Sequence, residues 1–204
     1  RAMVRNITFR LIGISLGLSL VPAPPAWAAT KFSLDPSHTS VGFSIRHMLI
    51  STVRGSFSGV AGEIVYDPDD PTRSWVRVEI DAASIDTGNK DRDNHLKGPD
   101  FFDVANYPKI TFESTKVEKR GDNWVAYGQL TIKGVTREIA IPFRLNGPIN
   151  DPWGNLRIGV EAETITLNRQ DFGISWNQVL DAGGLAVGNE VSVYISAEAA
   201  AQTP

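Results

Sequence analysis

Hydrophobic and polar residues alternate along most of the chain after residue 40. An alternation with a period of two is typical of a β-strand with one buried face, because successive side chains point to opposite sides of a strand. We therefore predict a set of strands whose apolar faces share one interior. The apolar sets are Val41/Phe43/Ile45, Val76/Val78/Ile80, Trp124/Ala126/Gly128/Leu130/Ile132, Ile139/Ile141/Phe143/Leu145, Leu156/Ile158/Val160/Ala162 and Val191/Val193/Ile195/Ala197.

Turn-forming sequences such as "DPDDPTR", "KRGDN" and "NGPINDPWGN" separate these runs. The chain thus reads as seven or eight antiparallel strands with short connections, which indicates an up-and-down barrel or a sandwich. Several runs reach about ten residues, or about 33 Å at strand rise, and this length favours the barrel. Two segments lack the alternation: residues 168–188 are mixed and rich in glycine, and "NKDRDNHLK" at 89–97 predicts a turn or two of helix.

The interior of an eight-stranded barrel is either filled by side chains or able to hold one small ligand. Small residues occur at several inward positions, namely Ala126, Gly128, Ala162 and Ala197, and they would leave room for a ligand. A solid core, in which small residues serve strand crossing, is an open alternative. A one-residue slip would instead turn an apolar set outward, into a homodimer contact.

The first 28 residues have the features of a secretory signal peptide. Arg1, Arg5 and Arg10 precede the apolar run at 11–21, and Ala26-Trp27-Ala28 is an Ala-x-Ala cleavage site. The run is shorter than the ~20 residues that a spanning helix needs, so we expect no membrane segment after processing. We predict export to the periplasm and a single domain over 29–204.

Composition excludes several classes of function. Removal of residues 1–28 takes away three arginines and no acidic residue, which changes the net charge from -3 to -6. Nucleic acids and anionic membranes attract clustered Lys and Arg, and this chain has no such cluster, so we expect no nucleic-acid partner. The absence of cysteine removes disulfides, thiolate nucleophiles and thiolate metal sites.

Signals for metal binding and catalysis are weak. The histidines, His38, His47 and His95, lack the spacing of a local chelate, and "DRD" at 91–93 lacks the glycine and glutamate of a calcium loop. No Gly-x-Ser-x-Gly elbow occurs. Pairs of aspartates such as Asp91/Asp93 are present, but aspartate is common in turns. We expect no metal, no cofactor and no catalytic residues.

Several blocks resemble the YceI-like family, which comprises exported, lipocalin-like proteins that bind polyisoprenoids and other long apolar molecules. They cover the chain after the signal peptide in the right order. One departure is "HMLIST" at 47–52, where relatives usually have glycine after the methionine and this chain has Leu49. The blocks are "LDPSHTSVGFSIRHMLISTVRGSFSGVAGEI", "SIDTGNKDRDNHLKGPDFFDVANYPKITFES", "GQLTIKGVTREIAIPF", "RQDFGISWN" and "VGNEVSVYISAEA".

The resemblance implies an all-β fold: an extended eight-stranded antiparallel, lipocalin-like barrel with a short helical segment and an apolar channel. It also implies a binding protein, since the family has no common catalytic reaction. We therefore expect a periplasmic carrier, or sequestering protein, for a long-chain isoprenoid or a similar amphiphile. The alternatives are a hydrolase or isomerase that acts on an apolar substrate in the same channel, and a solid barrel that serves as an interaction protein.

The alternation and the resemblance together predict the ligand-binding residues. The lining set is Val41, Phe43, Ile45, Val78, Ile80, Ile110, Phe112, Leu130, Ile132, Ile158 and Val160, with His47 at the end of the first long strand. We also expect Phe101 and Phe102 to close the barrel, with at least one of them buried.

The predicted helix at 89–97 adds candidates at the opening of the barrel. Arg92, His95 and Leu96 share one helical face by the i, i+3, i+4 rule. Leu96 would anchor the helix, and the planar fork of Arg92 would hold a phosphate or carbonyl head group. The alternative is that Arg92 pairs with an aspartate and ties the helix to the end of a strand.

Overall fold

The computed structural model describes residues 29–181 and 183–202; the predicted signal peptide lies outside this range. The strands are β1 (Thr30–Leu34), β2 (Ser40–His47), β3 (Ser51–Phe57), β4 (Val60–Tyr66), β5 (Trp75–Asp81), β6 (Ile85–Asp86), β7 (Lys109–Arg120), β8 (Asn123–Ile132), β9 (Val135–Asn150), β10 (Leu156–Ala162), β11 (Ile165–Asn168) and β12 (Val187–Ala201). The helices are α1 (Lys90–Lys97) and the 3₁₀ turns η1 (Pro36–His38), η2 (Pro71–Arg73), η3 (Ala82–Ser84) and η4 (Arg169–Phe172).

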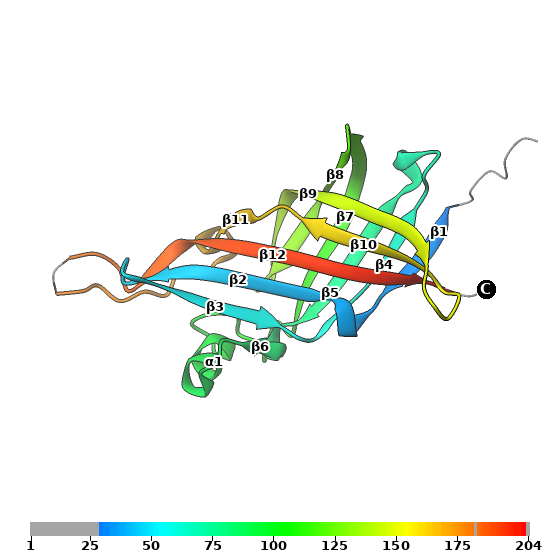
Figure 1. The fold of residues 1–204 in the computed structure, drawn as a ribbon. Helices are drawn as coiled ribbons and strands as arrows, with labels where there is room; N and C mark the ends of the chain where they lie inside the picture. Colours follow the sequence, from blue (N-terminus) through cyan, green and yellow to red (C-terminus); the bar gives the residue numbers. More distant parts are fainter. Residues whose placement is uncertain (1–28, 182, 203–204) are drawn as a thin grey trace, which may run out of the picture.

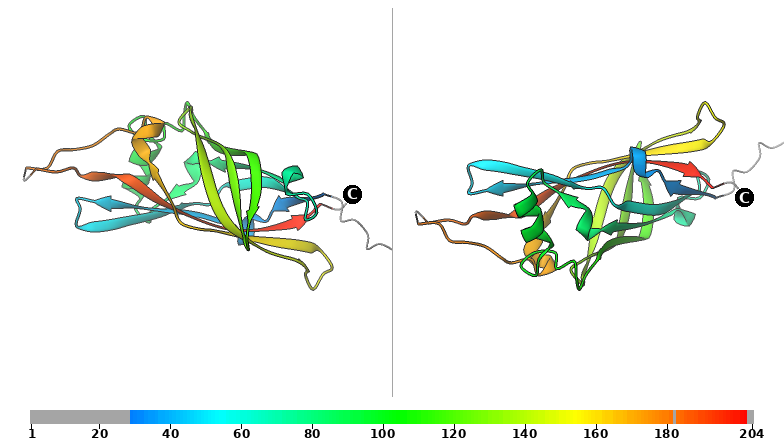
Figure 2. Two further views of the ribbon diagram at one scale, coloured as in Figure 1. Left: turned by 90° about the horizontal axis from the view of Figure 1, so that it is seen from above. Right: turned by 90° about the horizontal axis from the view of Figure 1, so that it is seen from below.

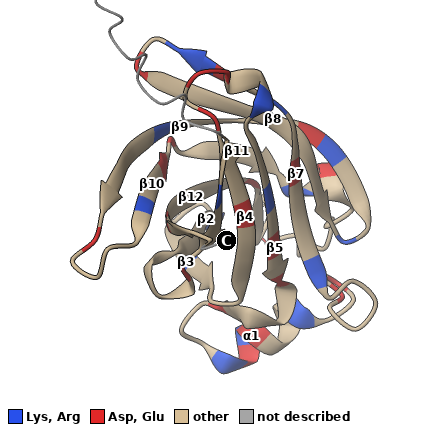
Figure 3. Ribbon diagram, turned by 90° about the vertical axis from the view of Figure 1, so that its right-hand side faces the viewer, with Lys and Arg blue, Asp and Glu red and all other residues tan. Residues whose placement is uncertain are grey.

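Eight strands close into an antiparallel barrel in the order β1-β4-β5-β7-β8-β9-β10-β12. The ring closes because β12 pairs with β10 on one edge and with β1 on the other. Figure 3 looks along this barrel and shows acidic and basic residues interspersed on its strands and turns. The structure confirms the predicted all-β, eight-stranded antiparallel barrel with one short helix.

β12 extends the barrel beyond the closed ring. Its C-terminal part pairs with β10 and β1, whereas residues 187–196 pair with β2 and residues 190–193 pair with β11. β2 continues the sheet to β3, and β3 pairs with β6. Figures 1 and 2 show β2, β3 and the start of β12 running together past the ring. The molecule is therefore longer along β12 than across the barrel.

Helix α1 lies beside β6, outside the sheet (Figure 1). The Asn89 side chain accepts a hydrogen bond from the Arg92 backbone N–H at 3.0 Å and caps the first turn. Asp91 and Asp93 are in that turn, where the helix dipole favours negative charge. Gly98 ends the helix with a hydrogen bond from its N–H to the His95 carbonyl. The helix predicted at 89–97 is confirmed.

The turn between β2 and β3 explains the departure at Leu49. Met48 and Leu49 have φ values of 51° and 63°. A two-residue hairpin turn with both central φ angles positive favours glycine and asparagine, because other side chains crowd the backbone in this conformation. Leu49 is exposed and borders no cavity, so it changes the turn and narrows no entrance.

The hydrophobic core consists of two clusters of buried residues. The larger cluster runs along the barrel interior and includes Phe57, Ile110, Phe112 and Trp124. The smaller cluster consists of Phe32, Ile158 and Ala199. Within the described ranges, no helix is both long enough and apolar enough to cross a membrane.

Candidate ligand-binding site

The inside of the closed ring contains an apolar cavity, which we call the ring chamber. Its volume is about 860 Å³ when the space open to solvent is included. All eight ring strands contribute to its wall. The lining residues are Leu34, Thr39, Val41, Val60, Ile64, Val65, Tyr66, Ser74, Trp75, Val76, Val78, Phe112, Val117, Trp124, Ala126, Ile141, Phe143, Leu145, Val160, Ala162, Ile195 and Ala197.

A second cavity, the outer chamber, lies where β2, β11 and η4 extend the barrel. Its volume is about 980 Å³ on the same basis. Its lining is also apolar, apart from one charged side chain, Arg169. The lining residues are Val41, Gly42, Phe43, Phe57, Val78, Ile80, Phe102, Ile110, Phe112, Leu130, Ile132, Ile139, Ile141, Ile165, Leu167, Arg169, Phe172, Ile174, Val191, Val193 and Ile195.

The two chambers adjoin and form one channel, because Val41, Val78, Phe112, Ile141 and Ile195 belong to both walls. On β8 the lining runs from Trp124 in the ring chamber to Ile132 in the outer chamber. Eight residue steps at a strand rise of about 3.3 Å span about 26 Å. A channel of this length suits an elongated apolar molecule.

The smaller core cluster fills the barrel at the end of the ring chamber. Phe32, Ile158 and Ala199 are exposed by at most 2%. The cluster packs against Leu34 and Leu145, which also line the ring chamber. Ile158 therefore faces inward, but it is part of this plug and not of the cavity wall.

Most of the residues predicted from the alternation border the channel. Ile45 and His47 do not: they follow Phe43 on the same face of β2, but lie past the end of the outer chamber. Ile158 is absent from the wall for the reason given above. The predicted residues that line a chamber are Val41, Phe43, Val78, Ile80, Phe102, Ile110, Phe112, Leu130, Ile132 and Val160.

The small inward residues have two different roles. Ala126, Ala162 and Ala197 line the ring chamber and leave space there, as the sequence suggested. Gly128 does not, because a Cβ atom at this position would lie 2.7 Å from the Phe112 ring and 2.3 Å from the Glu113 carbonyl oxygen. The expectation that Gly128 enlarges the cavity is therefore wrong: its missing side chain makes room for the Phe112 ring and the β7 backbone.

The two phenylalanines after α1 have separate positions. Phe102 lines the outer chamber and contacts Phe57 edge to face, with ring centroids 5.7 Å apart. Phe101 is 6% exposed and packs against His95 and Trp176, at centroid distances of 5.0 and 5.3 Å. One phenylalanine therefore belongs to the channel wall and the other to a cluster outside it.

The charged face of α1 does not reach the channel. The Arg92 Nε donates to the Thr87 Oγ1 at 2.7 Å and its Nη2 donates to the Thr87 carbonyl at 2.8 Å. Asp93 accepts from the same hydroxyl and from the Thr87 backbone N–H. Arg92, His95 and Leu96 line neither chamber. The expectation that Arg92 lies beside the ligand is corrected, since its donors are used to hold the segment before α1.

Arg169 is the polar residue of the channel that the sequence prediction missed. It is the first residue of η4 and is 6% exposed. Its Nε donates to the Gly188 carbonyl at 2.8 Å, and Nη1 donates to the carbonyls of Ile174 and Trp176 at 2.8 and 2.9 Å. Burial lowers the pKa of this guanidinium below its ordinary value, because the charged form loses hydration. The block "RQDFGISWN" contained the residue but gave no sign of its burial.

The other missed lining residues carry a signal that was visible in the sequence. They belong to the alternating sets of β8, β9 and β12, and the predicted list did not extend to them. The residues are Trp124, Ile139, Ile141, Phe143, Leu145, Val191, Val193 and Ile195.

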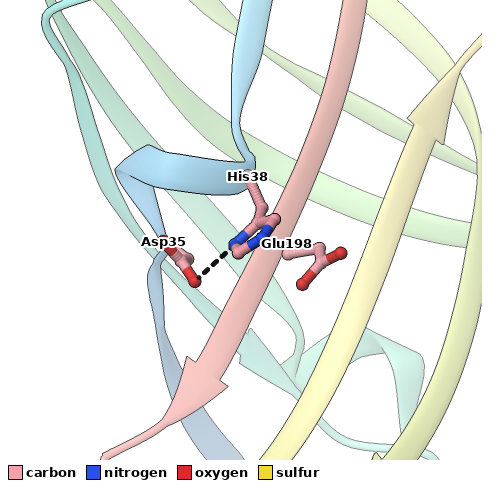
Figure 4. A group of neighbouring side chains, drawn as sticks. All are labelled: Asp35, His38 and Glu198. Carbon is pink, nitrogen blue, oxygen red and sulfur yellow. Dashed lines mark hydrogen bonds and ion pairs between the residues drawn. The ribbon is translucent and has the colours of Figure 1, made fainter.

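A second polar cluster lies on the outside of the barrel. Asp35, His38 and Glu198 place one ligand atom each within 4.8 Å of one another, close enough for a metal ion (Figure 4). However, the Arg157 guanidinium donates to both the Asp35 and Glu198 carboxylates. Arg157, with help from His38, holds the pKa of Asp35 far below its ordinary value. The carboxylates are thus already neutralised by a fixed cation, which makes this cluster an ion-pair network.

Together, these features define an extended antiparallel barrel with an apolar interior channel. Residues 32–199 match the model of the YceI-like domain, and the chain belongs to this family. The UPF0312 protein of Yersinia pestis (strain Pestoides F) is 39% identical over 166 residues, which are 81% of this chain and 86% of that protein.

Two solved structures show the same fold. Burkholderia cenocepacia BcnA superimposes with a TM-score of 0.71 at 22% identity, covering 81% of this chain and 98% of that one. A polyisoprenoid binding domain from Saccharophagus degradans has a TM-score of 0.64 at 17% identity, with coverage of 84% and 98%.

Proposed function

We propose that the protein binds a long-chain isoprenoid, or a similar amphiphilic lipid, inside the barrel and acts as its carrier or sequestering protein. The observation that carries this proposal is the continuous apolar channel formed by the two chambers. Channel volumes in this range are usual for ligand pockets. The printed description of the Saccharophagus degradans domain, a polyisoprenoid binding domain, supports the same ligand class.

Burial of the ligand chain supplies enough free energy for binding. Each buried methylene contributes roughly 0.8 kcal/mol, so about twenty carbons contribute about 16 kcal/mol. Association costs roughly 4–15 kcal/mol in lost freedom of motion. The apolar contacts alone are therefore sufficient for measurable affinity, and polar residues are left to orient the head group.

The lining favours binding over catalysis. Among the described residues, neither chamber wall includes Asp, Glu or His, the usual acid and base groups of hydrolases and isomerases. The proposed location is the periplasm, on the basis of the signal-peptide pattern in residues 1–28. Analysis of the mature N-terminus tests this location: it should begin at Ala29.

Filling the channel tests the proposed function. Ala126 is 3% exposed and lines the ring chamber, so Ala126→Phe places a ring where the lipid chain would lie. We expect binding of geranylgeraniol, followed by the fluorescence of the lining residues Trp75 and Trp124, to weaken at least about tenfold. Thermal stability should hold or rise, because filling an apolar cavity restores packing contacts.

Ala140→Phe is the matched control, because Ala140 is exposed and lies between the lining residues Ile139 and Ile141 on the opposite face of β9. This variant should bind like the wild type. Equal affinity in a folded Ala126→Phe variant would contradict binding in the ring chamber.

A further inference from the structure

Arg169 is the one charged side chain among the residues that line the two chambers. It follows β11 directly, at the start of η4, and reaches the outer chamber opposite the end that adjoins the ring chamber. A guanidinium in an apolar wall is costly, because burial removes its hydration. Its presence there needs a compensating interaction.

The protein supplies only part of this compensation. The described acceptors are the carbonyl oxygens of Gly188, Ile174 and Trp176 and the Asn189 side-chain oxygen. All four are neutral, and no carboxylate of the described residues pairs with Arg169. The positive charge of the buried group therefore has no counter-charge.

The geometry also leaves one donor for a ligand. A guanidinium has five N–H groups. Nε and Nη1 make three hydrogen bonds of 2.8–2.9 Å, whereas Nη2, with two N–H groups, makes a single bond of 3.3 Å to Asn189. The stronger contacts fix the plane of the guanidinium and leave Nη2 as its least satisfied part. Arg169 is thus oriented in advance for an acceptor that enters from the channel.

We infer that Arg169 binds an anionic oxygen head group, a phosphate or a carboxylate, at the end of the apolar chain of the ligand. The tail then runs from the outer chamber into the ring chamber, toward Trp124. A charge-assisted hydrogen bond in a site with little water is stronger than a neutral one, and an anion supplies the missing counter-charge. This inference rests on the proposed function, and it specifies the class of lipid: acidic amphiphiles over neutral ones.

The experiment compares geranylgeranyl monophosphate with geranylgeraniol, which has the same chain and a neutral hydroxyl. Binding is measured by isothermal titration calorimetry on the processed protein. We expect the wild type to bind the phosphate at least about tenfold more tightly than the alcohol, as for a hydrogen bond to a charged group. Equal affinities of the wild type for the two ligands would overturn the inference, without recourse to any variant.

Arg169→Met then locates the preference. It keeps much of the apolar stem and removes the charge, so the phosphate should lose its advantage while the alcohol retains its affinity. Arg77→Met is the control, since Arg77 lies on the exposed outer side of β5 and pairs with Glu113 at 2.6 Å. It removes the same charge from the protein and should keep the phosphate preference.

Other outcomes separate the two proposals. Equal loss of both ligands in Arg169→Met, with a lower unfolding temperature, would show that Arg169 is a structural tie and overturn the inference alone. Where this variant fails to fold, Arg169→Lys keeps the charge without the planar fork and should retain a weaker phosphate preference; the wild-type comparison decides independently. If the wild type binds neither ligand, the proposed function fails, and this inference fails with it.

Discussion

The two ends of the barrel contain partly or fully buried arginines in opposite surroundings. Near the solid end, where Phe32, Ile158 and Ala199 fill the interior, Arg157 pairs with the carboxylates of Asp35, Glu198 and Asp151. In the wall of the outer chamber, Arg169 has neutral acceptors and no described carboxylate partner. At the solid end both the space and the charge are satisfied by the protein itself. At the hollow end both remain for a ligand.

This contrast separates stability from function within one fold. Removal of a side chain at the solid end leaves a cavity or an unpaired charge in the folded protein, so it affects stability. Removal of a side chain at the hollow end changes a surface that faces empty volume, so it affects binding more than stability. The predictions below test this division.

The largest effect is expected from truncation at the solid end. Phe32 is 1% exposed, and Phe32→Ala should lower the free energy of unfolding by about 3–5 kcal/mol, as for other buried aromatic residues. Phe102→Ala, in the outer chamber wall, should cost clearly less, because Phe102 is only partly buried and borders open space. Urea denaturation measures both values. A similar loss in the two variants would contradict the division between the ends.

A smaller effect is expected at the ion-pair network of the solid end. Asp35→Asn removes one charge partner of Arg157 and should lower the free energy of unfolding at pH 7 by about 1–2 kcal/mol, in the range of hydrogen bonds between charged groups. Because the folded-state pKa of Asp35 lies below the ordinary value of 3.8, its contribution is complete above that pH and is lost as the pH falls further.

Unfolding measured between pH 7 and pH 3 on both proteins checks the sign of this effect. The difference in stability between wild type and Asp35→Asn should be constant down to about pH 4 and then decrease. A difference that grows toward low pH would refute the assignment of the Asp35 charge. Affinity for geranylgeraniol at pH 7 should be the same in both proteins.

The smallest effect is expected at α1. Arg92→Met removes two hydrogen bonds to Thr87 and should lower the free energy of unfolding by about 1 kcal/mol. The ratio of affinities for the prenyl phosphate and the prenyl alcohol should not change, because Arg92 borders neither chamber. Titration of both ligands measures this ratio. A selective loss of phosphate binding would assign the head group to Arg92 and remove it from Arg169.

The sequence predicted which faces of the strands point inward, because that property depends on a period of two. It did not predict how far along the barrel each residue lies. Ile45 and Ile158 are on the expected faces, yet one lies past the channel and the other is in the plug, since axial position depends on strand stagger. Gly128 was misread for a related reason: its neighbour Phe112 is on another strand, and their contact follows from the β7–β8 register.

The charged residues were less predictable than the apolar ones. The short helix followed from "NKDRDNHLK", but the use of Arg92 by Thr87 depends on how the chain enters the helix. Arg169 gave no local signal, because two of its acceptors, Gly188 and Asn189, are about twenty residues away along the chain. A sequence pattern can place a charge on an element, but only the tertiary structure shows whether that charge has a partner.

Native mass spectrometry of the exported protein, purified gently from the cells that produce it, tests the central claim most directly. We predict a mass in excess of the polypeptide that is released on denaturation and identified as a long-chain lipid, with exchange for added geranylgeranyl monophosphate. The Ala126→Phe variant, prepared in the same way, should carry less of it. A bare polypeptide mass, with no uptake of added prenyl lipid, would contradict the account.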